Sequence, residues 1–147
     1  MKKLIFLLSF AVVFAVNAQT FTMKSVWGGS TDSVTNSGNN NLKTQINGLG
    51  QVTVQAIITK ISGTGAGTAV LQGSLDGTNW VTINYVTSEI WGANSTGSPN
   101  DTFTLTNVTS QTVSWFLEDN QYVYYRVYVA GSGTELLRLS ATAILRK

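Results

Sequence analysis

The chain contains no cysteine and no histidine among its 147 residues, and its single proline is Pro99. The absence of cysteine excludes disulfide bonds and thiolate metal sites, so packing and sheet hydrogen bonds must hold the fold together. The absence of histidine removes the commonest metal ligand and the side chain best suited to proton transfer near neutral pH. Both absences disfavour a catalytic or transition-metal centre.

Sequence motifs of catalysis are lacking as well. No G-x-S-x-G nucleophile elbow, phosphate-binding loop or dinucleotide fingerprint occurs. A glycosidase would need two of the seven carboxylates at a set separation across a cleft, whereas the adjacent Glu118 and Asp119 would point in different directions from a turn. We therefore expect a protein that is not an enzyme and that has no catalytic residues and no cofactor.

Charged residues are few and balanced. Nine basic and seven acidic residues give a formal net charge of +2, but Lys2 and Lys3 lie in an N-terminal segment of different composition. Without that segment, basic and acidic residues are equal in number. The remaining basic residues are scattered along the chain, with only Arg146 and Lys147 adjacent. A nucleic-acid-binding groove requires clustered cations, so no nucleic-acid partner is expected.

Residues 1–18 resemble a secretory signal peptide. Lys2 and Lys3 precede an apolar run from Leu4 to Val16, and Val16-Asn17-Ala18 forms a small-residue cleavage site. As a helix, this run would be about 20 Å long, shorter than the ~30 Å hydrocarbon layer of a bilayer. We expect this hydrophobic helix to be cleaved after Ala18, which leaves a single exported domain, residues 19–147. The alternative is a retained N-terminal anchor, and only then is a membrane contact expected.

After residue 18, apolar and polar residues alternate in short segments, as in half-buried β-strands. The predicted strands are Asn40 to Ile46, Gln51 to Ile61, Thr68 to Leu75, Trp80 to Val86, Thr102 to Val108, Thr112 to Leu117, Tyr122 to Ala130 and Glu135 to Leu145. Two long stretches rich in Gly, Ser and Asn are expected to be loops, Ser25 to Asn39 and Thr87 to Asp101. The predicted fold class is all-β: an antiparallel β-sandwich, similar to a jelly roll, of about eight strands.

The alternation also predicts which side chains share a face of each strand. The predicted sets are Val52, Val54, Ala56 and Ile58; Ala69, Leu71 and Leu75; Val81, Ile83 and Tyr85; Phe103 and Leu105; Val113, Trp115 and Leu117; Val123, Tyr125, Val127 and Val129; and Leu137, Leu139, Ala141, Ala143 and Leu145.

The segment from Ser62 to Ile83 contains the strongest local signal. Asp76-Gly77-Thr78-Asn79 separates two alternating runs, and an Asp-Gly pair in that position is typical of a hairpin turn because glycine accepts a positive φ. Asp76 and Asn79 could supply oxygen ligands to Ca²⁺. The simpler interpretation, which we favour, is that Asp76 caps its own turn, since one carboxylate rarely holds calcium unaided.

The same segment carries a family resemblance. The pattern SGTxxGTxxLQGSxDGTNW, the later YYRVYVAGSGT and the basic end Leu145-Arg146-Lys147 resemble small virion proteins of phages that infect Bacteroidota. The similarity extends over Asp32 to Lys147, and a weaker one links the turn to galactose-binding and discoidin-like β-sandwiches. The resemblance implies a structural or host-facing part of a particle, without enzymatic activity, and it brings no catalytic residues.

Aromatic residues are the best candidates for contacts. Trp80 and Trp115 are expected in the core, whereas Trp27 and Trp91 lie in polar stretches and are candidates for exposed contact residues. A row on one strand face combines tyrosine and arginine, which are enriched where proteins meet. It consists of Tyr122, Tyr124, Arg126 and Tyr128, and it forms either an interface or the second buried face of a central strand.

These observations predict a non-enzymatic structural or adhesive module at a virion surface or in the extracellular space. The leading hypothesis is a phage virion accessory protein, such as a capsid decoration, spike or fibre component. It would pack against copies of itself, for example as a trimer, or against other virion or cell-surface proteins. The alternative is a secreted carbohydrate-binding module of a Bacteroidota cell that places Trp27, Trp80 or Trp91 against a glycan.

Overall fold

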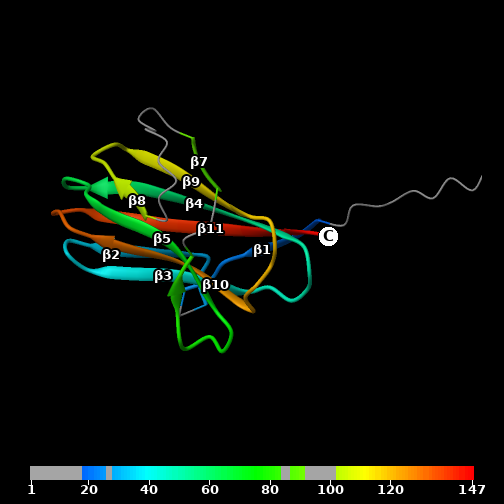
Figure 1. Ribbon diagram of the computed structural model, residues 1–147. Helices are drawn as coiled ribbons and strands as arrows, with labels where there is room; N and C mark the ends of the chain where they lie inside the picture. The colour runs from blue at the N-terminus through cyan, green and yellow to red at the C-terminus, as the bar shows by residue number, and fades with distance from the viewer. Residues whose placement is uncertain (1–17, 26–27, 84–86, 92–101) are drawn as a thin grey trace, which may run out of the picture.

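The computed structural model describes residues 18–25, 28–83, 87–91 and 102–147, and these residues are all-β (Figure 1). The eleven strands are β1 (Ala18–Thr22), β2 (Thr31–Thr35), β3 (Asn39–Gln45), β4 (Gln51–Ser62), β5 (Gly67–Ser74), β6 (Val81–Thr82), β7 (Thr87–Trp91), β8 (Thr102–Leu105), β9 (Ser110–Leu117), β10 (Tyr124–Gly131) and β11 (Leu136–Arg146). Within these ranges no helix is long and apolar enough to cross a membrane. The predicted N-terminal helix lies outside the described residues.

The strands form two antiparallel sheets. Sheet A has the order β1-β11-β4-β9-β7, with β2 also paired to β11; sheet B has the order β3-β10-β5-β6, with β8 also paired to β5. The pairs are nested along the chain: β2 with β11, β3 with β10, β4 with β9, and β5 with β8. This nesting is the pattern of one long hairpin whose two arms pair along their length. Here, successive pairs of strands belong alternately to sheet A and sheet B. The predicted all-β class with antiparallel strands is confirmed.

The two sheets share one buried hydrophobic cluster. Sheet A contributes the alternating apolar sets of β4, β9 and β11, and sheet B contributes Leu42, Leu71, Tyr125, Val127 and Val129. The predicted core sets of β4, β9 and β11 are all buried, Trp115 completely. Each fully buried aliphatic side chain of this kind contributes roughly 1.5–3 kcal/mol. With no disulfide available, this cluster and the strand ladders hold the domain together.

The predicted second strand of the hairpin, Trp80 to Val86, is confirmed only in part. Val81 and Thr82 form β6 and pair with β5, and Ile83 N donates a 3.1 Å hydrogen bond to Leu71 O. Residues 84–86 lie outside the described part of the chain. Leu75 is 68% exposed rather than grouped with Ala69 and Leu71, because β5 ends at Ser74 and the turn begins there. Val81 is 52% exposed while Ile83 is fully buried, so these two do not share a face. Phe103 is half-buried and Leu105 buried, as the pattern of β8 predicts.

Both predicted loops contain strands. The stretch Ser25 to Asn39 includes β2, which pairs with β11, and the stretch Thr87 to Asp101 includes β7, which pairs with β9. In β2 only Val34 is fully buried, so an edge strand of threonine, serine and aspartate shows almost no apolar alternation. β1 was not predicted either. It pairs with the end of β11, and cleavage after Ala18 would leave its remaining residues in the ladder.

Tyr122 lies on the core rather than in the predicted outward row. β10 begins only at Tyr124, and the Tyr122 ring packs against the core and edge-on to Tyr125, with ring centroids 6.0 Å apart. Val123 is half-buried and outside the strand for the same reason. The ring of Tyr122 sits over Gly73 in β5, where a Cβ would overlap its Cγ and Cδ2 atoms. A glycine inside a strand often marks such a close approach.

We predict that Gly73→Ala lowers the free energy of unfolding by about 1–3 kcal/mol, because the new methyl group must displace the Tyr122 ring. The loss should shrink when Gly73→Ala is introduced into Tyr122→Ala, since the two residues are in contact. Urea denaturation of the four proteins measures both effects. Gly65→Ala is the control, because its Cβ would meet atoms no closer than 3.5 Å. Equal losses for the two glycine variants would contradict the assignment.

Candidate functional site

The outer face of sheet B brings together three cationic side chains that are far apart in the sequence. Lys24 is paired with Lys43 through two backbone hydrogen bonds of 2.8 Å, Lys43 is opposite Arg126 in β10, and Arg126 is opposite Gln72 in β5. Their chain neighbours Met23, Leu42 and Val127 are buried in the core, so alternation directs these three cations outward. We call Lys24, Lys43 and Arg126 the cationic row.

Arg126 is held in place by neutral partners. Its Nε donates a 2.6 Å hydrogen bond to Gln72 Oε1, and its guanidinium carbon lies 4.4 Å from the ring centroid of Trp80 and 5.5 Å from that of Tyr128. Partial burial lowers the pKa of Arg126, and the neighbouring Tyr128 offsets part of this effect. A guanidinium remains charged in proteins, so the result is a fixed cation stacked on aromatic rings.

The cationic row has no acidic partner within its own sheet. The described strands of sheet B, β3, β5, β6, β8 and β10, contain no aspartate or glutamate, and their outward positions are mainly hydroxyl, amide and aromatic side chains. Like charges directly opposite each other on neighbouring strands are unfavourable. The face is therefore electrostatically complementary to an acidic partner.

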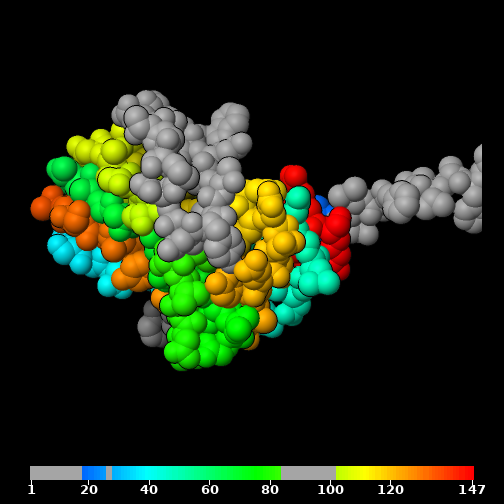
Figure 2. Space-filling model, viewed as in Figure 1, coloured from blue at the N-terminus to red at the C-terminus, as the bar shows by residue number. Residues whose placement is uncertain are grey.

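The hairpin turn after β5 projects beside this face and is drawn green in Figures 1 and 2. Asp76 Oδ1 accepts hydrogen bonds from the backbone N–H groups of Thr78 and Asn79 and from Ser74 Oγ, and Asp76 Oδ2 accepts one from Asn79 Nδ2. These bonds, led by the Asn79 N–H, hold the pKa of Asp76 well below its usual value. Gly77 has a φ of 74°, as the turn requires. The carboxylate thus caps its own turn.

A cleft of about 490 Å³ opens between this turn and the end of the cationic row. Its lining consists of Lys24, Ser25, Gly28, Lys43, Thr44, Gln45, Asp76, Gly77 and Tyr124. The ring of Tyr124 stands against the turn, 3.5 Å from where a Cβ on Gly77 would be. The cleft therefore offers two ammonium groups, an amide, a carboxylate and an aromatic ring. Such groups can hold a polar or acidic ligand.

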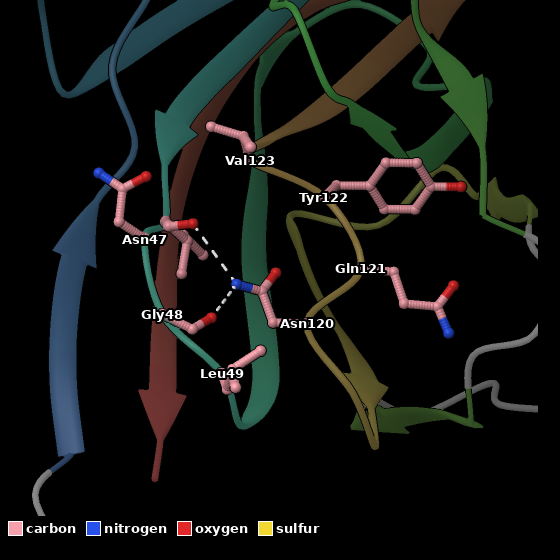
Figure 3. A pocket seen from close by; sticks show the side chains of 8 residues that line it. Asn47, Gly48, Leu49, Asn120, Gln121, Tyr122 and Val123 are labelled. Carbon is pink, nitrogen blue, oxygen red and sulfur yellow. Dashed lines mark hydrogen bonds between the residues drawn. The ribbon is translucent and has the colours of Figure 1, made fainter.

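A second hollow has a volume of about 290 Å³ and lies between the turn after β3 and the segment that precedes β10 (Figure 3). Asn120 occupies its centre: its Nδ2 donates to Gly48 O at 2.6 Å and to Ile46 O at 3.4 Å. Asn120 Oδ1 accepts a 2.7 Å hydrogen bond from the phenol of Tyr125. Burial is the main cause that raises the pKa of Tyr125 to about 12. Asn120 and Tyr125 thus fasten the turn after β3 to β10.

The structure locates most of the sequence-predicted contact residues. Tyr124, Arg126 and Tyr128 share the outer face of sheet B and are half-buried, as their alternation predicts. Trp80 is half-buried beneath Arg126, so the prediction that it lies in the core is wrong. Trp27 lies outside the described residues, and of Trp91 the structure describes only its place in β7. Lys24 and Lys43 were not predicted as site residues, because the register that unites them cannot be read from the sequence.

A comparison of the sequence with models of known protein families and with curated proteins found no match.

We predict that Asp76→Asn lowers the melting temperature at pH 7, because the charged form of Asp76 accepts the hydrogen bonds of the turn. The folded-state pKa is depressed, so this stabilisation is present above the unfolded value near 4 and is lost as the pH falls. The loss is complete only below the depressed folded-state pKa, so the difference in melting temperature between the two proteins should narrow, without vanishing, as the pH falls from 7 to 3. A difference that stays constant with pH would contradict the capping role.

We predict that Tyr125→Phe lowers the free energy of unfolding by about 1–2 kcal/mol at pH 8, because Asn120 Oδ1 loses its donor. The folded-state pKa of Tyr125 is raised to about 12, so the native state favours the neutral phenol. That stabilisation is present below the ordinary value near 10 and is lost as the pH rises towards 12. Urea denaturation at pH 8 and pH 11 should show a smaller difference at pH 11. A larger difference there would contradict the assignment.

Proposed function

We propose that the protein is a non-enzymatic adhesive or structural module that binds an acidic partner through the outer face of sheet B. The cationic row, on a sheet whose strands carry no acidic residue, supports this proposal most directly. Arg126 is already ordered by Gln72 and Trp80, so binding through it costs little side-chain entropy. Electrostatic complementarity of this kind raises association rates and selects partners.

The architecture that we propose is a jelly-roll sandwich. Its support is the nested pairing of β2 with β11, β3 with β10, β4 with β9 and β5 with β8, in pairs that alternate between two sheets around one core. Jelly rolls occur in viral capsid and lectin domains. A fold does not determine a function, so this similarity is an analogy. It agrees with the two settings that the sequence suggests, a virion surface and a glycan-binding module.

The leading proposal for the setting is a phage virion accessory protein, such as a capsid decoration, spike or fibre component. If two copies of the protein met through this face around a two-fold axis, their cationic rows would lie opposite each other and repel. We therefore infer that this face contacts a different, acidic surface, either on another virion or cell-surface protein or on another part of a copy in a ring such as a trimer. Export after cleavage at Ala18 remains part of the proposal.

A secreted carbohydrate-binding module is the second candidate, and the cleft supports it. The ring of Tyr124 and the two lysines of the cleft provide the flat apolar and polar groups that sugar rings require. The half-buried indole of Trp80 lies outside the lining of the cleft, against Arg126 of the cationic row. Because the cations dominate, the glycan would be acidic.

The proposal predicts binding to immobilised polyanions that weakens with salt, measured by surface plasmon resonance on heparin, polyglutamate and neutral dextran. Lys43→Gln should raise the dissociation constant for a polyanion about 3- to 10-fold, the equivalent of ~1 kcal/mol. Arg138→Gln is the matched control, because it removes one exposed positive charge from β11 in sheet A. Absence of polyanion binding, or equal weakening by the two variants, would contradict the proposed face.

The same measurement separates the two settings. Preference for heparin over polyglutamate that is lost in Trp80→Ala would favour the carbohydrate-binding module. Preference for polyglutamate that is unchanged in Trp80→Ala would favour a protein partner on a virion or cell.

A further inference from the structure

The carboxylate of Glu135 is buried without a partner. Glu135 follows the turn between β10 and β11, and its side chain is 1% exposed. Neither Oε1 nor Oε2 has a hydrogen-bond partner anywhere in the described part of the chain. A charged group removed from water without an ion pair or a hydrogen bond is strongly destabilising, so native proteins pair buried carboxylates or bind metal ions with them.

Further oxygen atoms surround this carboxylate. A Cβ on Gly131 would collide with both Glu135 Oε1 and the carbonyl oxygen of Asn36, and a Cβ on Gly133 would collide with both Glu135 Oε2 and the carbonyl oxygen of Thr64. The carboxylate therefore lies against the turn, between these two carbonyl groups. Among the residues described, neither carbonyl oxygen receives a hydrogen bond. Four acceptors adjoin one another with no donor between them.

Backbone hydrogen bonds from three segments fix this arrangement. Asn36 N donates to Glu135 O at 2.7 Å, Gly131 N donates to Gly38 O at 2.9 Å, and Ser132 N donates to Ala66 O at 3.2 Å. The turn between β2 and β3, the loop between β4 and β5, and the turn between β10 and β11 are thus joined at one place. These bonds hold the main chain of the three segments together around the Glu135 side chain.

We propose that this place is a binding site for a hard cation, with Ca²⁺ as its best ligand. Glu135 would bind through both carboxylate oxygens, and Asn36 and Thr64 through their carbonyl oxygens. Calcium accepts carboxylate, carbonyl and water oxygens in irregular geometry and takes about six to eight of them, whereas magnesium demands a nearly ideal octahedron. Water would complete the shell beside Ser132 and Thr134, which are exposed.

The site differs from those that acidic clusters make. Where the chain is described, no three acidic, histidine or cysteine side chains come together at metal-binding distance. The proposed site has one carboxylate and takes its other protein ligands from the main chain. It is independent of the proposed function, because Glu135 is buried between turns and does not belong to the cationic row or to the cleft beside it.

The test is the melting temperature of the full chain after treatment with a chelator, measured with and without CaCl₂, together with calorimetric titration of Ca²⁺. At a calcium concentration about 100-fold above the dissociation constant, the wild-type melting temperature should rise by about 5–10 °C. Glu135→Gln keeps the size of the side chain and should abolish both the rise and the heat of binding. In chelator, this variant should melt at or above the wild-type temperature, because it no longer buries a charge.

Asp76→Asn is the control, since Asp76 is the calcium candidate that the sequence suggests. This variant should keep the full calcium-induced rise. A rise that is lost in Asp76→Asn and kept in Glu135→Gln would overturn the proposal and place the cation at the hairpin turn. A wild-type protein that neither binds Ca²⁺ nor changes its melting temperature would also overturn it.

Discussion

The ladder between β4 and β11 is the interaction on which the rest of the structure depends. It pairs Gln51 with Arg146 at one end and Ser62 with Leu136 at the other. Every second residue is buried in the core from Val52 to Ile58 in β4 and from Leu137 to Leu145 in β11. β9 is added to one side of this pair, and β1 and β2 to the other. The two strands are distant in sequence, so pairing them costs a large loop-closure entropy. Burial of their apolar faces must offset this cost without help from a disulfide. This requirement explains why these strands show the clearest alternation in the chain.

Prediction from the sequence succeeds for the strands that bury apolar side chains on one face. The inward sets of β4, β9 and β11 were predicted residue by residue, because burial on one side leaves a period of two. β2 and β7 escaped prediction because edge strands of serine, threonine and acidic residues carry little apolar pattern. Tyr122 was assigned to the outward row because the alternation continues across Val123, although β10 starts only at Tyr124. Local pattern alone does not show where pairing ends.

The candidate site was predicted in part for a related reason. The outward placement of Tyr124, Arg126 and Tyr128 follows from alternation within one strand, but the gathering of Lys24, Lys43 and Arg126 follows from the register of three separate segments. Trp80 was expected in the core because indoles are usually buried there, yet one of its faces is covered by a guanidinium instead. Although residues 19–147 have a net charge near zero, three cations gather in the cationic row, and association depends on this local field rather than on the total charge.

The sequence suggests Asp76 as the calcium ligand, whereas the structure favours Glu135. Asp76 lies in a motif that suggests a metal ligand, yet its oxygens are occupied by four donors of its own turn and the carboxylate is exposed to water. Glu135 follows an unremarkable Gly-Ser-Gly turn, yet its oxygens are buried beside two carbonyl groups with no donor. A carboxylate that is already satisfied gains little from a cation, whereas one that is buried and unpaired gains a great deal. The missing donors at Glu135, rather than a sequence motif, therefore point to the cation site, and the three joined turns are the part of the fold that such a cation would stabilise.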